Sequence, residues 1–159
     1  EDRFGVVMTD AQVARQKEEV HEAYKTELRP VPGVEQAILA LRQPRCVASS
    51  RPPETIAVSL KLTGLDRHFG GKLFSASMVA RGKPHPDIFL HAAREMGHAP
   101  ARTAVVEDTV TGVTAGVAAG MKVFGYAGAS YSDPDALARA GATVFRAMDE
   151  LPGLIGAEP

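Results

Sequence analysis

The stretch AVVEDTVTGVTAGVAAG, residues 104–120, decides the fold of this chain. It begins as a short apolar run that ends in two adjacent carboxylates, Glu107 and Asp108, and a glycine-spaced segment follows at once. A short apolar run followed by a helical segment is typical of a buried parallel strand and the helix that covers it. Charges at the end of a buried strand are costly to desolvate, so we expect this acid pair to have a partner.

The same alternation of short apolar runs and helical segments continues along most of the chain. Strands of a few residues that alternate with helices predict an α/β fold, in which a parallel sheet is covered by helices on both faces. The predicted strands are residues 46–48, 73–74, 103–106, 122–126 and 142–145, and the predicted helices are residues 34–42, 52–62, 87–96, 112–119 and 134–140.

The N-terminal part of the chain has a different pattern. Residues 10–29 contain apolar side chains close to helical spacing and predict a single helix. The sequence PVPG at residues 30–33 then breaks the helix and is the best domain boundary in the chain. We therefore predict two units, residues 1–29 and residues 30–159.

The composition excludes several classes of protein. The chain has 159 residues, enough for one domain with a small appendage, and a formal net charge of −1. This charge gives no general attraction to nucleic acid or to an anionic membrane surface. No apolar run of about 18 residues is present, so we expect no membrane-spanning helix. The single cysteine, Cys46, and a start unlike a signal peptide favour a reduced, cytoplasmic setting.

Polar side chains with complementary chemistry follow three of the predicted strands. Ser49 and Ser50 follow the first strand, Lys83 lies in the loop after the second, and Glu107 and Asp108 follow the third. In open parallel sheets, ligands bind at the carboxyl ends of the strands. A hydroxyl, an ammonium group and two carboxylates suit a phosphate held beside Mg²⁺, because carboxylate oxygens bind this hard cation and lysine neutralises phosphate.

Three segments carry a family resemblance. VASS (47–50), RGKPHPDIF (81–89) and VVEDTVTGVTAGVAAGM (105–121) resemble motifs II, III and IV of the haloacid dehalogenase superfamily in order and spacing. The chain is most similar to the branch with a helical cap, which contains sugar-phosphate phosphatases and β-phosphoglucomutase. The resemblance implies a Rossmann-like α/β core, preceded at residues 1–29 by the C-terminal part of a helical cap.

The resemblance also implies a role for each candidate residue. Ser49 would donate a hydrogen bond to the transferring phosphoryl group, and Ser50 would contribute to the same phosphate site. Lys83 would bridge the phosphoryl group and the nucleophile, and Glu107 and Asp108 would hold Mg²⁺ directly or through water. The implied activity is that of a Mg²⁺-dependent phosphatase, acting on a small phosphorylated metabolite such as a sugar phosphate through an aspartyl-phosphate intermediate.

One motif of the family is absent from the sequence. No DxD pattern occurs, although motif I supplies the nucleophilic aspartate and the acid/base aspartate of the family. The strand that carries motif I lies between the strands of motifs II and IV, so its absence would leave two strand edges unpaired. We therefore expect residues 30–159 to be a core that lacks its first strand, in a fragment that is inactive without an upstream nucleophile.

Several alternatives remain open at this stage. A phosphomutase of the same family would share these residues and differ in what its cap admits. A catalytically inactive, truncated domain would instead bind a partner through its open sheet edge. A receiver-like signalling domain also clusters acids at strand ends, but the order of acids and lysine argues against it. The acid pair alone is often no more than a helix cap, and Lys83 alone is most often a surface lysine. The sequence predicts neither the exact substrate nor the oligomeric state.

Overall fold

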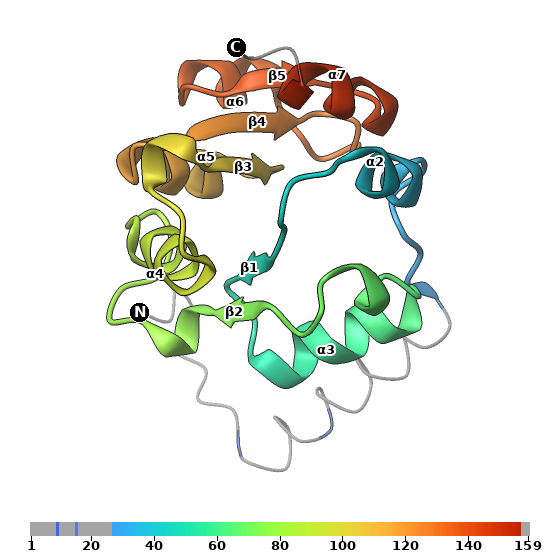
Figure 1. Cartoon of the computed structure of the whole chain (residues 1–159), viewed down its shortest axis with the longest axis vertical. Coiled ribbons are helices and arrows are strands. Elements are labelled where there is room, and N and C mark those ends of the chain that lie inside the picture. Colours follow the sequence, from blue (N-terminus) through green and yellow to red (C-terminus); the bar gives the residue numbers. More distant parts are fainter. Residues whose placement is uncertain (1–8, 10–14, 16–26, 157–159) are drawn as a thin grey trace.

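The computed structural model describes residues 9, 15 and 27–156. Most of the helix predicted at residues 10–29 lies outside the described residues. Beyond it, the predicted alternation of helices and strands is confirmed (Figure 1). The helices are α2 (Val34–Ala40), α3 (Pro53–Leu62), α4 (Asp87–Met96), α5 (Val110–Ala118), α6 (Pro134–Arg139) and α7 (Leu151–Gly156).

The strands are parallel to their neighbours and form two sheets. One sheet pairs β1 with β2, and the other has the order β3-β4-β5. The strands are β1 (Val47–Ser49), β2 (Leu73–Ser75), β3 (Ala104–Glu107), β4 (Lys122–Tyr126) and β5 (Thr143–Phe145). Within the described part of the chain, β1 and β3 each have a strand on one edge only. Figure 1 shows β1 on the side of β2 that faces β3.

The family resemblance led us to expect two unpaired strand edges between the strands of motifs II and IV, and in the described part of the chain these strands, β1 and β3, do lie in separate sheets. Strand periodicity predicts that a strand exists but does not predict its neighbour, because pairing depends on which edges meet in space. The first strand begins and ends one residue later than predicted. Ser49 is therefore the last residue of β1 and does not follow the strand. Helix α7 was not predicted, because its sequence LPGLIG contains a proline and two glycines, which are poor helix formers.

The core lies mainly around the three-stranded sheet. Successive residues of β4 point to opposite faces, so Val123 packs among α4 and α5 while Phe124 packs among α2 and α7. On one face the cluster includes Ile88 of α4 and Val113 of α5, both fully buried. On the other face Phe124 contacts the buried side chain of Phe145 and those of the short helices. The helical layers on both faces are therefore confirmed for this sheet.

A glycine allows α5 to lie close to the sheet. A Cβ atom on Gly116 would lie 2.7 Å from Cγ2 of Val123, which is closer than real side-chain contacts allow. Gly116 is therefore a residue at which α5 packs closely against the sheet. Helix α5 begins at the carboxyl end of β3, and its position determines where the acid pair lies. No helix in the described part of the chain is both long and apolar enough to cross a bilayer.

Candidate active site

Lys83 connects the two sheets. It lies in the loop before α4, and its Nζ donates a hydrogen bond to the carbonyl oxygen of Ala48 in β1, at 3.3 Å. The same Nζ donates to Oε1 of Glu107, the last residue of β3. The structure thus brings together two of the predicted site residues from segments that are 24 positions apart. The ammonium group of Lys83 therefore links β1 to the carboxyl end of β3.

The ion pair between Lys83 and Glu107 is largely removed from solvent. Each side chain is only 10% exposed. Charges at this depth need partners, because each would otherwise lose its hydration without compensation. The ammonium group also lies 4.8 Å from the ring centroid of Phe89, where the face of the aromatic ring attracts a cation. Lys83 is therefore a buried, ion-paired lysine and not a surface lysine.

The first turn of α5 fixes the second oxygen of Glu107. The hydroxyl of Thr109 donates to Oε2 of Glu107 at 3.1 Å, and the same hydroxyl oxygen accepts from the backbone N–H of Gly112 at 3.2 Å. Thr109 therefore caps α5 and orients the carboxylate at once. Gly112 is needed for this arrangement, since a Cβ atom there would lie 2.0 Å from Oε2 of Glu107.

Asp108 has a partner that sequence reasoning missed. The hydroxyl of Tyr131 donates a hydrogen bond to Oδ2 of Asp108 at 2.7 Å. Tyr131 lies in the loop between β4 and α6, and no local pattern marks it. This hydrogen bond to a carboxylate, followed by desolvation and the charge of Asp108, raises the pKa of Tyr131 to about 12. The phenol therefore remains protonated, and a donor, at neutral pH.

The two predicted serines have separate environments. Oγ of Ser49 accepts a hydrogen bond from the backbone N–H of Arg51 at 3.2 Å, which closes the turn after β1. Ser50 is exposed, and no described residue bonds its hydroxyl. In the described part of the chain, neither serine is hydrogen-bonded to Lys83 or to the acid pair. The structure thus brings Lys83 and Glu107 together, with Asp108 beside them in sequence, and leaves Ser49 and Ser50 at the neighbouring strand end.

Ser75 is a further residue that the sequence did not reveal. It ends β2, it is the buried polar residue of the described core, and its hydroxyl donates to the carbonyl oxygen of Arg51 at 2.7 Å. The end of β2 thereby fixes the turn that carries Ser49. An apolar-to-polar change at a strand end could have indicated Ser75, but its partner is 24 residues away.

A cavity of about 250 Å³ lies beside this turn. It is mostly apolar and lies between β1 and α3. Its lining residues are Leu28, Val47, Ser49, Arg51, Ile56, Ser59 and Leu60.

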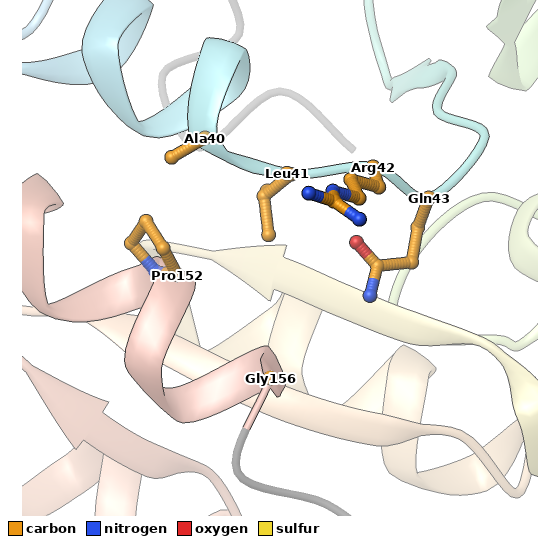
Figure 2. A pocket seen from close by; sticks show the side chains of 6 residues that line it. All are labelled: Ala40, Leu41, Arg42, Gln43, Pro152 and Gly156. Carbon is orange, nitrogen blue, oxygen red and sulfur yellow. The ribbon is translucent and has the colours of Figure 1, made fainter.

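A second cavity, of about 190 Å³, lies elsewhere in the molecule. Figure 2 shows the segment after α2 on one side of it and α7 on the other. None of the predicted site residues lines it. Its lining consists of Ala40, Leu41, Arg42, Gln43, Pro152 and Gly156.

The acid pair has the chemistry of a site for a hard cation. Carboxylate oxygens are the ligands that Mg²⁺ prefers, and Oδ1 of Asp108 has no hydrogen-bond partner among the described residues. Lys83 and Thr109 occupy both oxygens of Glu107. Within residues 27–156, no group of three or more His, Cys, Asp or Glu side chains gathers around one point. The pair would therefore supply only part of an octahedral shell.

Comparisons with known proteins identify the family of this chain. A family model described as haloacid dehalogenase-like hydrolase matches residues 4–120. The chain is 30% identical over 136 residues to 6-phosphogluconate phosphatase of Escherichia coli, covering 86% of this chain and 61% of that protein. It is also 30% identical over 143 residues to a phosphorylated carbohydrates phosphatase of Thermotoga maritima, covering 85% of this chain and 65% of that protein. The chain thus spans less than two thirds of the length of these curated relatives.

Solved structures show the same fold. A conserved haloacid dehalogenase-like protein of unknown function from Agrobacterium tumefaciens superimposes with a TM-score of 0.85 at 33% identity, over 97% of this chain and 72% of that chain. A haloacid dehalogenase family hydrolase from Deinococcus radiodurans, with bound phosphate and sodium, superimposes with a TM-score of 0.82 at 29% identity. The match covers 98% of this chain and 71% of that chain. The family match, the fold and the motif-bearing residues lead to one conclusion: this chain belongs to the haloacid dehalogenase-like hydrolases.

Proposed function

We propose that this chain is the larger part of a divalent-metal-dependent phosphatase that hydrolyses a small phosphorylated metabolite. The observation that carries the proposal is Lys83, whose ammonium group joins the ends of β1 and β3 beside two carboxylates. A buried cation at the carboxyl end of a parallel sheet suits an anionic ligand, and the adjacent acids suit a metal ion that shares that ligand.

Each residue has a proposed task at this site. Lys83 neutralises negative charge on the phosphoryl group as the ester bond breaks. Ser49 donates its hydroxyl hydrogen to a phosphoryl oxygen while its own oxygen remains bonded to the backbone of Arg51, and Ser50 adds a backbone N–H. Glu107 and Asp108 hold the metal, directly or through water. When bound, Mg²⁺ supplies further neutralisation of the phosphoryl charge.

The nucleophile of the reaction is proposed to come from outside the described residues. The edges of β1 and β3 that face each other pair with no strand among the described residues, and Val106 of β3 is 42% exposed although it lies in a sheet. A parallel strand placed there would end beside Lys83. An aspartate at that end would form a bond to phosphorus as the ester P–O bond breaks, and the leaving alcohol would take a proton. Water would then release inorganic phosphate from the aspartyl phosphate.

We propose a sugar phosphate as the substrate class. Two relatives at 30% identity bear the names 6-phosphogluconate phosphatase and phosphorylated carbohydrates phosphatase. The cavity between β1 and α3 offers an apolar wall beside Ser49. The predicted cap remnant at residues 1–29, which would contact the sugar, lies largely outside the described residues.

Phosphate release tests this function. The protein at its natural length is incubated with a panel of sugar phosphates in Mg²⁺ or in EDTA. Lys83→Met and Asp108→Asn are each expected to lower kcat at least about a thousandfold, because each removes charge stabilisation of the reaction. Lys61→Met, at an exposed position of α3, is the matched control and should retain activity. Activity that survives both EDTA and Lys83→Met would overturn the proposal. An isomerised sugar phosphate without free phosphate would identify a mutase instead.

A further inference from the structure

We propose that Tyr131 is a positioning residue for the metal site: its hydroxyl holds Oδ2 of Asp108 and thereby directs Oδ1 toward the cation. This inference rests on the proposed function, because it takes Asp108 to be a metal ligand. Tyr131 itself touches neither metal nor substrate in this proposal. It acts through Asp108 alone.

The topology explains how a residue 23 positions away reaches the acid pair. Strands β3 and β4 are parallel neighbours, with Glu107 paired to Gly125, so both strands end at the same rim of the sheet. The loop that leaves β4 therefore passes the residue that follows β3. This places the hydroxyl of Tyr131 2.7 Å from Oδ2 of Asp108, which is a short distance typical of a hydrogen bond to a charged acceptor.

The loop that carries Tyr131 is attached to β5 at its start and contains a turn of its own. The backbone N–H of Ala127 donates to the carbonyl oxygen of Phe145 at 2.8 Å, and that of Ser132 donates to Ala129 at 3.1 Å. Gly128 lies so close to β5 that a Cβ atom there would be 2.3 Å from the carbonyl oxygen of Arg146. The path of the loop is thus fixed by backbone contacts that do not involve the carboxylate.

The exposure of Tyr131 points to a polar role and not to packing. The residue is 73% exposed, so its ring contributes little to the core. Among the described residues, its hydroxyl is hydrogen-bonded to a charged side chain at the candidate site. A large aromatic side chain held at the rim with its hydroxyl turned inward is expected where the hydroxyl has a task.

The oxygens of the acid pair show what that task is. Lys83 and Thr109 hold the two oxygens of Glu107, and Tyr131 holds Oδ2 of Asp108. Oδ1 of Asp108 is therefore the single oxygen of the pair without a hydrogen bond to any described residue. A carboxylate with one oxygen fixed can turn less freely, so its other oxygen is preorganised as a ligand. Residues that orient metal ligands in this way commonly contribute about 10- to 100-fold to metal affinity.

A metal titration tests the proposal without reference to turnover. The protein at its natural length is titrated with Mn²⁺ alone, and free Mn²⁺ is followed by electron paramagnetic resonance. Tyr131→Phe, which removes only the hydroxyl, is expected to raise the Kd for Mn²⁺ about tenfold, at the low end of that range because the bond is exposed. Tyr126→Phe is the matched control, since the hydroxyl of Tyr126 has no hydrogen bond to a described residue, and its Kd should stay within twofold of the wild type.

Asp108→Asn in the same titration separates the inference from the function on which it rests. If Asp108→Asn and Tyr131→Phe both weaken binding, the inference holds. If only Asp108→Asn does so, the inference is overturned while the metal site stands. If Asp108→Asn binds Mn²⁺ as tightly as the wild type, the proposed metal site itself fails. Tighter binding by Tyr131→Phe would also overturn the inference, because the hydroxyl would then compete with the cation.

A split between kinetic constants provides a second readout. Tyr131→Phe should raise the Mg²⁺ concentration for half-maximal phosphatase activity about tenfold, with kcat at saturating Mg²⁺ within about threefold of the wild type. A merely structural role would lower kcat at every Mg²⁺ concentration and would overturn the inference.

Discussion

The two sheets of this molecule differ in how they are built. The three-stranded sheet has a central strand, β4, whose side chains are buried on both faces by helices. The two-stranded sheet has no central strand, and all three residues of β1 are only half-buried. A pair of short strands is not independently stable and relies on other elements for its position. The comparison shows that stability is concentrated in one sheet, whereas half of the candidate site lies on the other.

Core truncation should show the largest effect and the largest contrast between the sheets. Phe124→Ala removes a ring that is 1% exposed in β4, and Phe74→Ala removes one that is 8% exposed in β2. We expect Phe124→Ala to lower the free energy of unfolding by about 3–5 kcal/mol, and Phe74→Ala by at least about 1 kcal/mol less. Urea denaturation followed by circular dichroism measures both. Equal losses would mean that the two sheets are equally well packed.

Removal of the ion pair between Lys83 and Glu107 should have the next largest effect on stability. Lys83→Met leaves the buried carboxylate of Glu107 without a positive charge beside it, and Glu107→Gln leaves the ammonium group of Lys83 without a negative charge beside it. Each single change is expected to cost about 3 kcal/mol of unfolding free energy. The double variant should cost clearly less than the sum of the two, because neither charge is then left alone. Additive losses in the double-mutant cycle would show that the pair does not tie β1 to β3.

Substitutions at two glycines of α5 should distinguish an effect on activity from an effect on stability. In Gly112→Ala the new methyl group would displace the carboxylate of Glu107, and in Gly116→Ala it would press on Val123. We expect Gly112→Ala to lower phosphatase activity about tenfold or more with less than about 1 kcal/mol of destabilisation, since alanine favours the helix. Gly116→Ala should cost about 1–3 kcal/mol, with activity retained where the protein is folded. The opposite pattern would contradict the proposed place of Glu107 in the site.

The smallest effect on stability is expected at a surface salt bridge between α2 and the segment that joins α3 to β2. Glu35 of α2 forms a salt bridge with His68 and Arg67, which lie between α3 and β2. Hydrogen bonds to His68 and then to Arg67 lower the pKa of Glu35 below its usual 4.5. A carboxyl whose pKa is lower in the folded state contributes stability above its ordinary pKa and loses it as the pH falls through the folded value.

Glu35→Gln should therefore flatten the acid side of the stability profile slightly. Thermal melts between pH 7 and pH 3 check this, with Glu54→Gln at an exposed position of α3 as the control. A wild-type profile that matches that of Glu35→Gln throughout this range would show that the salt bridge adds nothing measurable.

Local patterns in the sequence predicted much of the fold. The apolar run before Glu107 and the glycine spacing after it predicted β3 and α5, because burial and helix packing depend on nearby residues. Lys83 was placed beside the acids by the rule that parallel strands end at one rim, and the structure confirms its contact with Glu107. The proposed metal and phosphate roles of these residues remain predictions.

The remaining features depend on contacts that no local pattern encodes. The hydrogen bond from Tyr131 to Asp108 and the fixing of the Ser49 turn by Ser75 join segments 23 and 24 positions apart. The sequence by itself determined where the strands and most of the helices of the described part of the chain lie, to within one or two residues at their ends. Only the tertiary structure decided which edges pair and which hydroxyl holds each carboxylate, because those contacts arise when separate elements pack together.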